Sequence, residues 1–109
     1  SNFIAGGAAI NVISRHVGAR VTVVDCGVAA DLSPMNELKI KKVAPGTQNF
    51  AKGPAMSKEQ AVQAIEAGIS AFEEEFSSGG IDIAPVGDMG IGNTTPSSAI
   101  IACISVGNK

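Results

Sequence analysis

The sequence predicts an α/β fold built around a parallel sheet. Two short apolar runs, residues 21–25 and 81–86, have the length and character of buried parallel strands. Between them, residues 57–77 repeat apolar positions every three or four residues, which is the period of an amphipathic helix. Strand, crossover helix and strand make one right-handed βαβ unit, here with an unusually long first connection.

Composition narrows the class of protein. The chain has 109 residues, of which 45% are apolar and 17% charged, so one small folded domain is expected and not a disordered segment. A net charge of −2 and the absence of Trp and Tyr argue against a nucleic-acid-binding surface. No apolar run is long enough to span a membrane, so we predict a cytoplasmic protein without membrane contact. Cys26 and Cys103 lack metal-ligand spacing and are expected to be buried, reduced thiols, with no metal bound.

Residues 3–17 predict the first helix. Arg15 and His16 fall in its last turn, where positive charge suits the helix dipole, and Gly18 is placed for a left-handed residue after it. The Gly6-Gly7 pair indicates either close backbone packing or a break in the helix. His16, the only histidine, is interpreted as a solvent-facing side chain because no nucleophile pattern accompanies it.

The first predicted strand ends at Asp25, at the edge where α/β proteins bind ligands. A ligand contact and a turn cap are equally good readings of this carboxylate. Residues 30–56 lack periodicity and predict a long loop. Its lysines could reach an anionic ligand, although a solvated basic loop is favoured for each: Lys39, Lys41, Lys42 and Lys52.

The helix at residues 57–77 has a predicted start and end. Ser57 and Gln60 fit a capping box, and Gly79-Gly80 ends the helix. The acidic run Glu73–Glu75 is interpreted as solvated surface. The predicted apolar face consists of Ala61, Ile65, Ile69, Phe72 and Phe76.

A glycine-rich turn, residues 87–96, joins the second predicted strand to an apolar helix over residues 97–106. Thr94 or Thr95 is the predicted N-cap, Pro96 suits the first turn, and the helix is apolar enough to be buried. Backbone N–H groups in such a turn are expected to point outward without partners and to bind an anion, most often a phosphate.

The turn matches neither common phosphate-binding signature. No Gly-Lys-Ser/Thr follows, and Gly90-Ile91-Gly92 lacks the third glycine of a dinucleotide fingerprint. Asp88 could accept a proton, orient a sugar hydroxyl or hold the turn, since one carboxylate alone does not specify acid–base chemistry. The candidate ligand-binding residues are Gly90, Gly92, Asn93, Thr94 and Thr95, although the last three could serve only as helix caps.

Three blocks of sequence carry a resemblance to a known family. They are residues 2–12, NFIAGGAAINV; Lys39-Ile40 with GTQN at 46–49 and GPAM at 53–56; and GDMGIGNTT at 87–95. In these blocks the chain resembles the nicotinate-nucleotide–dimethylbenzimidazole phosphoribosyltransferases of cobalamin (vitamin B12) lower-ligand assembly. The likeness spans nearly the whole chain, and the third block is highly specific.

The resemblance implies a fold, a reaction and partners. The fold is a Rossmann-like three-layer α/β core, of which residues 1–109 form part of a single phosphoribosyltransferase domain. The reaction transfers the phosphoribosyl group of nicotinate mononucleotide to a nitrogen of 5,6-dimethylbenzimidazole, with inversion at the sugar and without metal or cofactor. Its products are α-ribazole phosphate and nicotinate. The full-length enzyme is expected to be a homodimer, and Asp88 would orient the ribose while the glycine-rich turn holds the phosphate.

Two departures from the family limit this reading. The family usually has Glu where this chain has Asp88, whose shorter side chain reaches less far towards the ribose. Family enzymes are also much longer: part of the base pocket precedes the first block, and the glutamate taken as general base lies beyond Lys109. We therefore expect the isolated chain to be inactive. Alternatives are a non-catalytic module that binds a phosphorylated nucleotide, and a subunit that needs other segments for activity.

Overall fold

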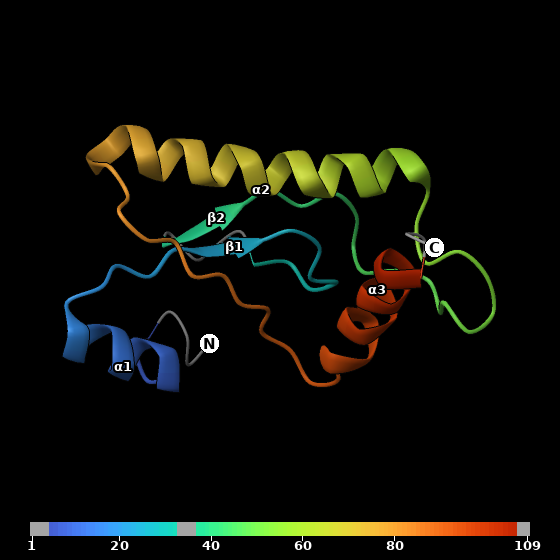
Figure 1. Ribbon diagram of the computed structural model, residues 1–109, viewed down its shortest axis with the longest axis horizontal. Helices are drawn as coiled ribbons and strands as arrows, with labels where there is room; N and C mark the ends of the chain where they lie inside the picture. The colour runs from blue at the N-terminus through green and yellow to red at the C-terminus, as the bar shows by residue number, and fades with distance from the viewer. Residues whose placement is uncertain (1–4, 33–36, 107–109) are drawn as a thin grey trace.

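The computed structural model describes residues 5–32 and 37–106. Within them the chain forms helix α1 (Ala9–Val17), strands β1 (Val23–Asp25) and β2 (Leu38–Ile40), and helices α2 (Lys58–Gly79) and α3 (Thr94–Val106). The strands are parallel, with Val23 opposite Leu38. Figure 1 shows α2 on one side of this small sheet and α1 and α3 on the other. The predicted α/β class is confirmed, and the elements lie in the layer order of a three-layer core.

Strand β2 was missed by the sequence interpretation, which assigned residues 30–56 to a loop. The signal is short: Leu38 and Ile40 alternate with Lys39 and Lys41. Three residues are too few to stand out by periodicity, and only the backbone ladder with β1 makes them a strand.

The predicted strand at residues 81–86 is wrong. This segment forms no ladder with any part of the chain that the structure describes, and Ile83 and Val86 are 85% and 98% exposed. An extended segment becomes a strand only when neighbouring backbone groups pair with it. The parallel partner of β1 is therefore β2, and the predicted βαβ unit does not form from these residues.

Helix α1 begins at Ala9, six residues later than predicted. Gly6 adopts a left-handed φ of +72°, so the glycine pair interrupts the predicted helix and lies in the turn before it. Predicted helical residues 3 and 4 lie outside the described part of the chain. At the other end, Gly18 also has a φ of +72° and caps the helix as predicted, directly after Arg15 and His16.

Helix α2 starts where its sequence predicts. The backbone N–H of Gln60 donates to Ser57 Oγ at 3.2 Å, and the N–H of Ser57 donates to Gln60 Oε1 at 2.9 Å, which completes the capping box. At the C-terminus, Gly80 caps the helix, and the Arg20 guanidinium donates to the Gly80 carbonyl at 3.0 Å.

The face of α2 nearest the sheet carries small residues, not the predicted large apolar ones. Ala71 is buried, and Ala64 lies beside the loop that follows β1. Small side chains let the helix come close to the strands, while the large apolar side chains of the predicted face remain exposed. Its exposed members are Ile65, Ile69, Phe72 and Phe76.

The predicted burial of α3 is also wrong for the described structure. Its large side chains, Ile100, Ile101 and Ile104, are more than half exposed. The chain exposes 8432 Å² in all. A compact monomer of 10.9 kDa exposes about 5,600 Å². Exposed apolar surface of this extent is typical of faces that contact another molecule.

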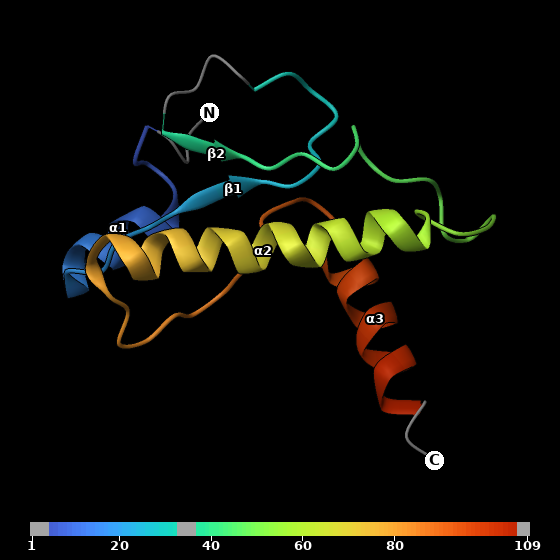
Figure 2. The same ribbon diagram turned by 90° about the horizontal axis from the view of Figure 1, so that it is seen from above.

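An ion-pair cluster fastens β2 to α2. Lys39 Nζ lies 3.0 Å from Glu74 and 2.9 Å from Glu75, and Lys41 Nζ lies 2.6 Å from Glu74. These ion pairs were not expected from the sequence, which predicted solvated side chains at all four positions, although the Glu74 side chain does remain 48% exposed. Residues 35 apart in sequence meet because the helix returns over the strand (Figures 1 and 2).

This cluster gives the fold an acid-sensitive contact. The hydrogen bonds from Lys41 and Lys39 lower the pKa of Glu74 from 4.5 to about 2. Because the pKa is lower in the folded state, the contribution to stability is complete above pH 4.5 and is lost as the pH falls towards about 2. Glu74→Gln is expected to flatten the dependence of unfolding midpoint on pH in this window. The exposed Glu73→Gln is the matched control, and equal pH curves for the two variants would contradict the assignment.

Candidate functional site

The glycine-rich turn leads directly into α3. The helix begins at Thr94, so Asn93 occupies the position before it, and the predicted N-caps Thr94 and Thr95 are already helical. Gly92 has a φ of +80°, a conformation that explains glycine at this position. The turn is held by the Asn93 carboxamide, which donates through Nδ2 to the Asp88 carbonyl at 2.7 Å.

Some amides of the turn have partners, contrary to the expectation that they all point outward. Asn93 N donates to the Gly90 carbonyl at 3.4 Å, and Thr95 N donates to the Gly92 carbonyl at 3.3 Å. Both bonds are long and therefore weak. An added Cβ at Gly90 or Gly92 would meet no atom within 4 Å, so the backbone of the turn faces open space. A ligand can approach this backbone closely.

The structure brings all six predicted site residues into this one turn. Asp88, Gly90, Gly92, Thr94 and Thr95 are exposed, and Asn93 is half-buried. The Asp88 side chain is therefore available to a ligand, while its backbone carbonyl serves the turn. Oxygen-bearing side chains and open backbone at the start of a helix suit a phosphorylated sugar.

Asp25 acts as a turn cap in the described structure, one of its two predicted roles. Its Oδ1 accepts from Gly27 N at 2.9 Å and from Val28 N at 2.7 Å, and its Oδ2 lies 3.3 Å from Lys42 Nζ. The residue is only 2% exposed. Desolvation raises the pKa of this carboxyl, but the hydrogen bonds from Val28, Gly27 and Lys42 outweigh it and leave the pKa below its ordinary value.

The loops that follow β1 and β2 stay paired beyond the strands. Their backbone hydrogen bonds, which continue the parallel ladder, are Lys41 N to Asp25 O at 2.9 Å, Val43 N to Cys26 O at 3.1 Å and Gly46 N to Gly27 O at 2.7 Å. The carboxyl-terminal edge of the sheet is therefore an ordered surface. Open α/β sheets bind their ligands at this edge.

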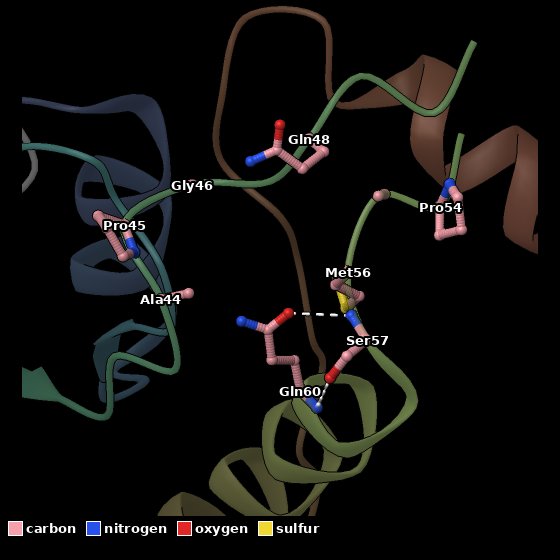
Figure 3. Close-up of a pocket in the computed structure, with 9 residues that line it drawn as sticks. Ala44, Pro45, Gly46, Gln48, Pro54, Met56, Ser57 and Gln60 are labelled. Atoms are coloured by element: carbon pink, nitrogen blue, oxygen red, sulfur yellow. Dashed lines mark hydrogen bonds between the residues drawn. The ribbon is translucent and has the colours of Figure 1, made fainter. Parts of the chain in front are cut away.

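A hollow of about 370 Å³ opens beside this edge, at the start of α2 (Figure 3). The residues that line it are Ala44, Pro45, Gly46, Gln48, Pro54, Ala55, Met56, Ser57 and Gln60. A smaller hollow of about 70 Å³ shares four of these residues and adds Cys26, Gly27 and Ala64 among its walls. The sequence analysis did not predict this hollow, because its walls come from separate parts of the loop after β2 and from the first turn of α2, which only the fold brings together. The clustered glycines and prolines after β2 were the available signal.

The cysteines are not the buried thiols that the sequence predicted, since both are exposed and free. Partial burial and then the neighbouring Asp25 charge raise the pKa of the Cys26 thiol, against a smaller opposing effect of Lys41. Among the described residues, no three His, Cys, Asp or Glu side chains gather in a way that could hold a metal ion. His16 is exposed on α1, as predicted. None of the described helices has the length and hydropathy to cross a membrane.

Comparison with known proteins agrees with these motifs. A family described as phosphoribosyltransferase matches residues 1–108. Nicotinate-nucleotide–dimethylbenzimidazole phosphoribosyltransferases from Geotalea uraniireducens and from a Roseiflexus species are 58% and 57% identical to the chain over 104 residues, which is 95% of the chain. A crystal structure of the enzyme so named from Thermus thermophilus superposes with a TM-score of 0.87 at 43% identity over 94% of the chain.

These relatives are considerably longer. The chain spans 29% of the two bacterial proteins and 31% of the crystallised one. The match nevertheless includes the glycine-rich turn and every strand and helix of the described residues, because it covers residues 1–108. The chain therefore belongs to the phosphoribosyltransferase family that includes the nicotinate-nucleotide–dimethylbenzimidazole enzymes.

Proposed function

We propose that the chain supplies the phosphoribosyl-facing part of an enzyme that moves the phosphoribosyl group of nicotinate mononucleotide to 5,6-dimethylbenzimidazole. α-Ribazole phosphate and nicotinate are the products. The observation that carries the proposal is 58% identity over 104 residues to a protein named for these two substrates. A cytoplasmic, homodimeric full-length enzyme belongs to the same proposal.

The turn offers a role for each predicted residue. Open backbone at Gly90 and Gly92 would let the phosphate come close, and the amide and hydroxyls of Thr94 and Thr95 would bind its oxygens. Asn93 would hold the turn in shape through its bond to Asp88 O. Positive charge develops at the sugar carbon as nicotinate leaves, and a nearby carboxylate stabilises such charge. The exposed Asp88 side chain would do this while orienting the ribose.

Two other functions remain alternatives from the residues themselves. A non-catalytic module would bind nicotinate mononucleotide without transferring its phosphoribosyl group. A subunit would act only when other chains supply the remaining segments. The large apolar surface on α2 and α3 favours the transferase and the subunit over the module, because in both of them more polypeptide completes the protein.

A chimera tests the proposal. The matching segment of the Geotalea uraniireducens enzyme is replaced by this chain, and α-ribazole phosphate formed from nicotinate mononucleotide and dimethylbenzimidazole is measured by chromatography and mass spectrometry. We expect transfer by the chimera and none by the isolated 109 residues. A folded chimera that binds nicotinate mononucleotide without transfer would support the non-catalytic module. Turnover by the isolated chain would disprove the need for further segments.

A further inference from the structure

We propose that Ser97 is a positioning residue for Asp88 and acts on it through Asn93. Ser97 lies in the first turn of α3 and is not one of the residues that the sequence predicted for the site. Its hydroxyl donates to the Asn93 carbonyl at 2.8 Å, and the Asn93 carboxamide donates through Nδ2 to the Asp88 carbonyl at 2.7 Å. These two bonds, here called the Ser97 relay, connect the helix to the residue proposed to orient the ribose.

The Ser97 relay is the firmest connection between α3 and the glycine-rich turn. Backbone hydrogen bonds within the turn, donated by Asn93 N and Thr95 N, are 3.4 and 3.3 Å long and therefore weak. The glycines of the turn also leave its backbone more freedom than other residues would. Upstream, residues 81–86 form no ladder with the described part of the chain. The two short bonds of the relay therefore determine where Asp88 lies relative to α3.

The start of α3 explains why a side chain is needed for this connection. Pro96 has no N–H, so the first turn of the helix has one backbone donor fewer. The Asn93 carbonyl accepts from the N–H of Ser97 at 3.2 Å, and the hydroxyl of the same residue is its second donor. A carbonyl oxygen has two lone pairs, so both bonds can form at once. Two donors on one carbonyl fix the plane of that peptide group, and with it the direction in which the carboxamide points back to Asp88.

The expected effect on the reaction depends on the kind of group that is positioned, and this step rests on the proposed function. Positive charge develops on the sugar as nicotinate leaves, so the position of a carboxylate matters most in the transition state. The phosphate would meet Thr94 and Thr95, which the backbone of α3 holds in place. Loss of the Ser97 hydroxyl is therefore expected to lower kcat for transfer more than it changes KM for nicotinate mononucleotide.

Ser97→Ala in the chimera is the first test, with initial rates of α-ribazole phosphate formation measured by chromatography. We expect kcat to fall about fivefold, as for one lost hydrogen bond, with little change in KM. Ser97→Thr should keep the original kcat, because a threonine hydroxyl in a helix can reach the same carbonyl. The matched control is Ser98→Ala, the same change at the neighbouring exposed position. Equal kcat values for Ser97→Ala and Ser98→Ala would overturn the proposal, and so would a Ser97→Thr variant as slow as Ser97→Ala.

A double-mutant cycle with Asn93→Ala separates positioning from a purely structural role. This change removes the carboxamide and cuts the relay, but the backbone carbonyl at position 93 still accepts from Ser97. In this background we expect Ser97→Ala to cause no further loss of kcat, while it lowers the melting temperature by the same amount as in the unchanged background. The same loss of kcat in both backgrounds would show that Ser97 acts only through the stability of α3, and would overturn the relay.

A second readout needs no substrate. In the 109-residue chain, the rate at which the Asn93 Nδ2 protons exchange with water is measured by NMR. We expect this rate to rise about fivefold in Ser97→Ala and to stay the same in Ser98→Ala. Equal exchange rates in Ser97→Ala and the wild-type chain would overturn the relay. An unmutated chimera that forms no α-ribazole phosphate would instead contradict the proposed function, so the two failures are distinguishable.

Discussion

Gly90→Val is expected to weaken the binding of nicotinate mononucleotide to the chimera about 100-fold, the loss expected when one or two hydrogen bonds to a charged phosphate are blocked. The structure separates this effect from damage to the fold. Gly90 does not have a left-handed φ, and a Cβ at this position would meet no protein atom within 4 Å. The valine side chain would instead occupy the open space from which a ligand reaches the backbone of the turn.

The measurement is a calorimetric titration of the chimera with nicotinate mononucleotide, combined with circular dichroism to compare helix content. Gly68→Val is the matched control, since Gly68 also faces open space but lies on α2, away from the turn. Unchanged affinity in Gly90→Val would remove the turn from the phosphoribosyl site. Equal losses in both variants would point to a general effect on the fold.

Asp25→Ala is expected to lower the free energy of unfolding by about 3 kcal/mol, because two charge-assisted hydrogen bonds to backbone amides disappear at a buried position. Gly27 N and Val28 N would lose their acceptor, and Lys42 would lose its ion pair. The loop after β1 would keep its backbone hydrogen bonds to the loop after β2 but would lose the contact between Asp25 and Lys42.

Urea denaturation of the chain measures this change, with Asp25→Asn as the comparison. Asparagine keeps one acceptor oxygen for the two amides and should cost less than half as much. The lowered pKa of Asp25 also means that its contribution is present above its ordinary value of 3.8 and is lost as the pH falls below it. A difference between wild-type and Asp25→Ala stability that stays constant into strong acid would contradict this role.

Local sequence signals predicted local structure well. The capping box at Ser57 and Gln60 and the left-handed Gly18 depend only on residues close in sequence, and both are confirmed. The clustering of Asp88 to Thr95 in one turn is equally local. The resemblance in the third block pointed to the family that the comparisons then showed.

Contacts between distant segments were predicted poorly. Lys39 and Glu74 were each interpreted as solvated, and nothing near either residue reveals the other. Residues 81–86 have strand-like sequence, yet they lack a pairing partner among the described residues. The spacing of the large apolar side chains predicted one apolar face of α2, but those side chains are exposed, and the buried residue of the helix is the small Ala71.

The α/β class, the ends of α2, the glycine-rich turn before α3 and the family all follow from the sequence, because short-range propensity and motif spacing depend on neighbouring residues. The structure was needed to show that β2 pairs with β1, that Asp25 caps the loop after β1, and that the loops after both strands line a hollow at the start of α2. These features join segments separated by many residues. Which distant segments meet is set by the competition among whole-chain packings, and no local pattern records its outcome.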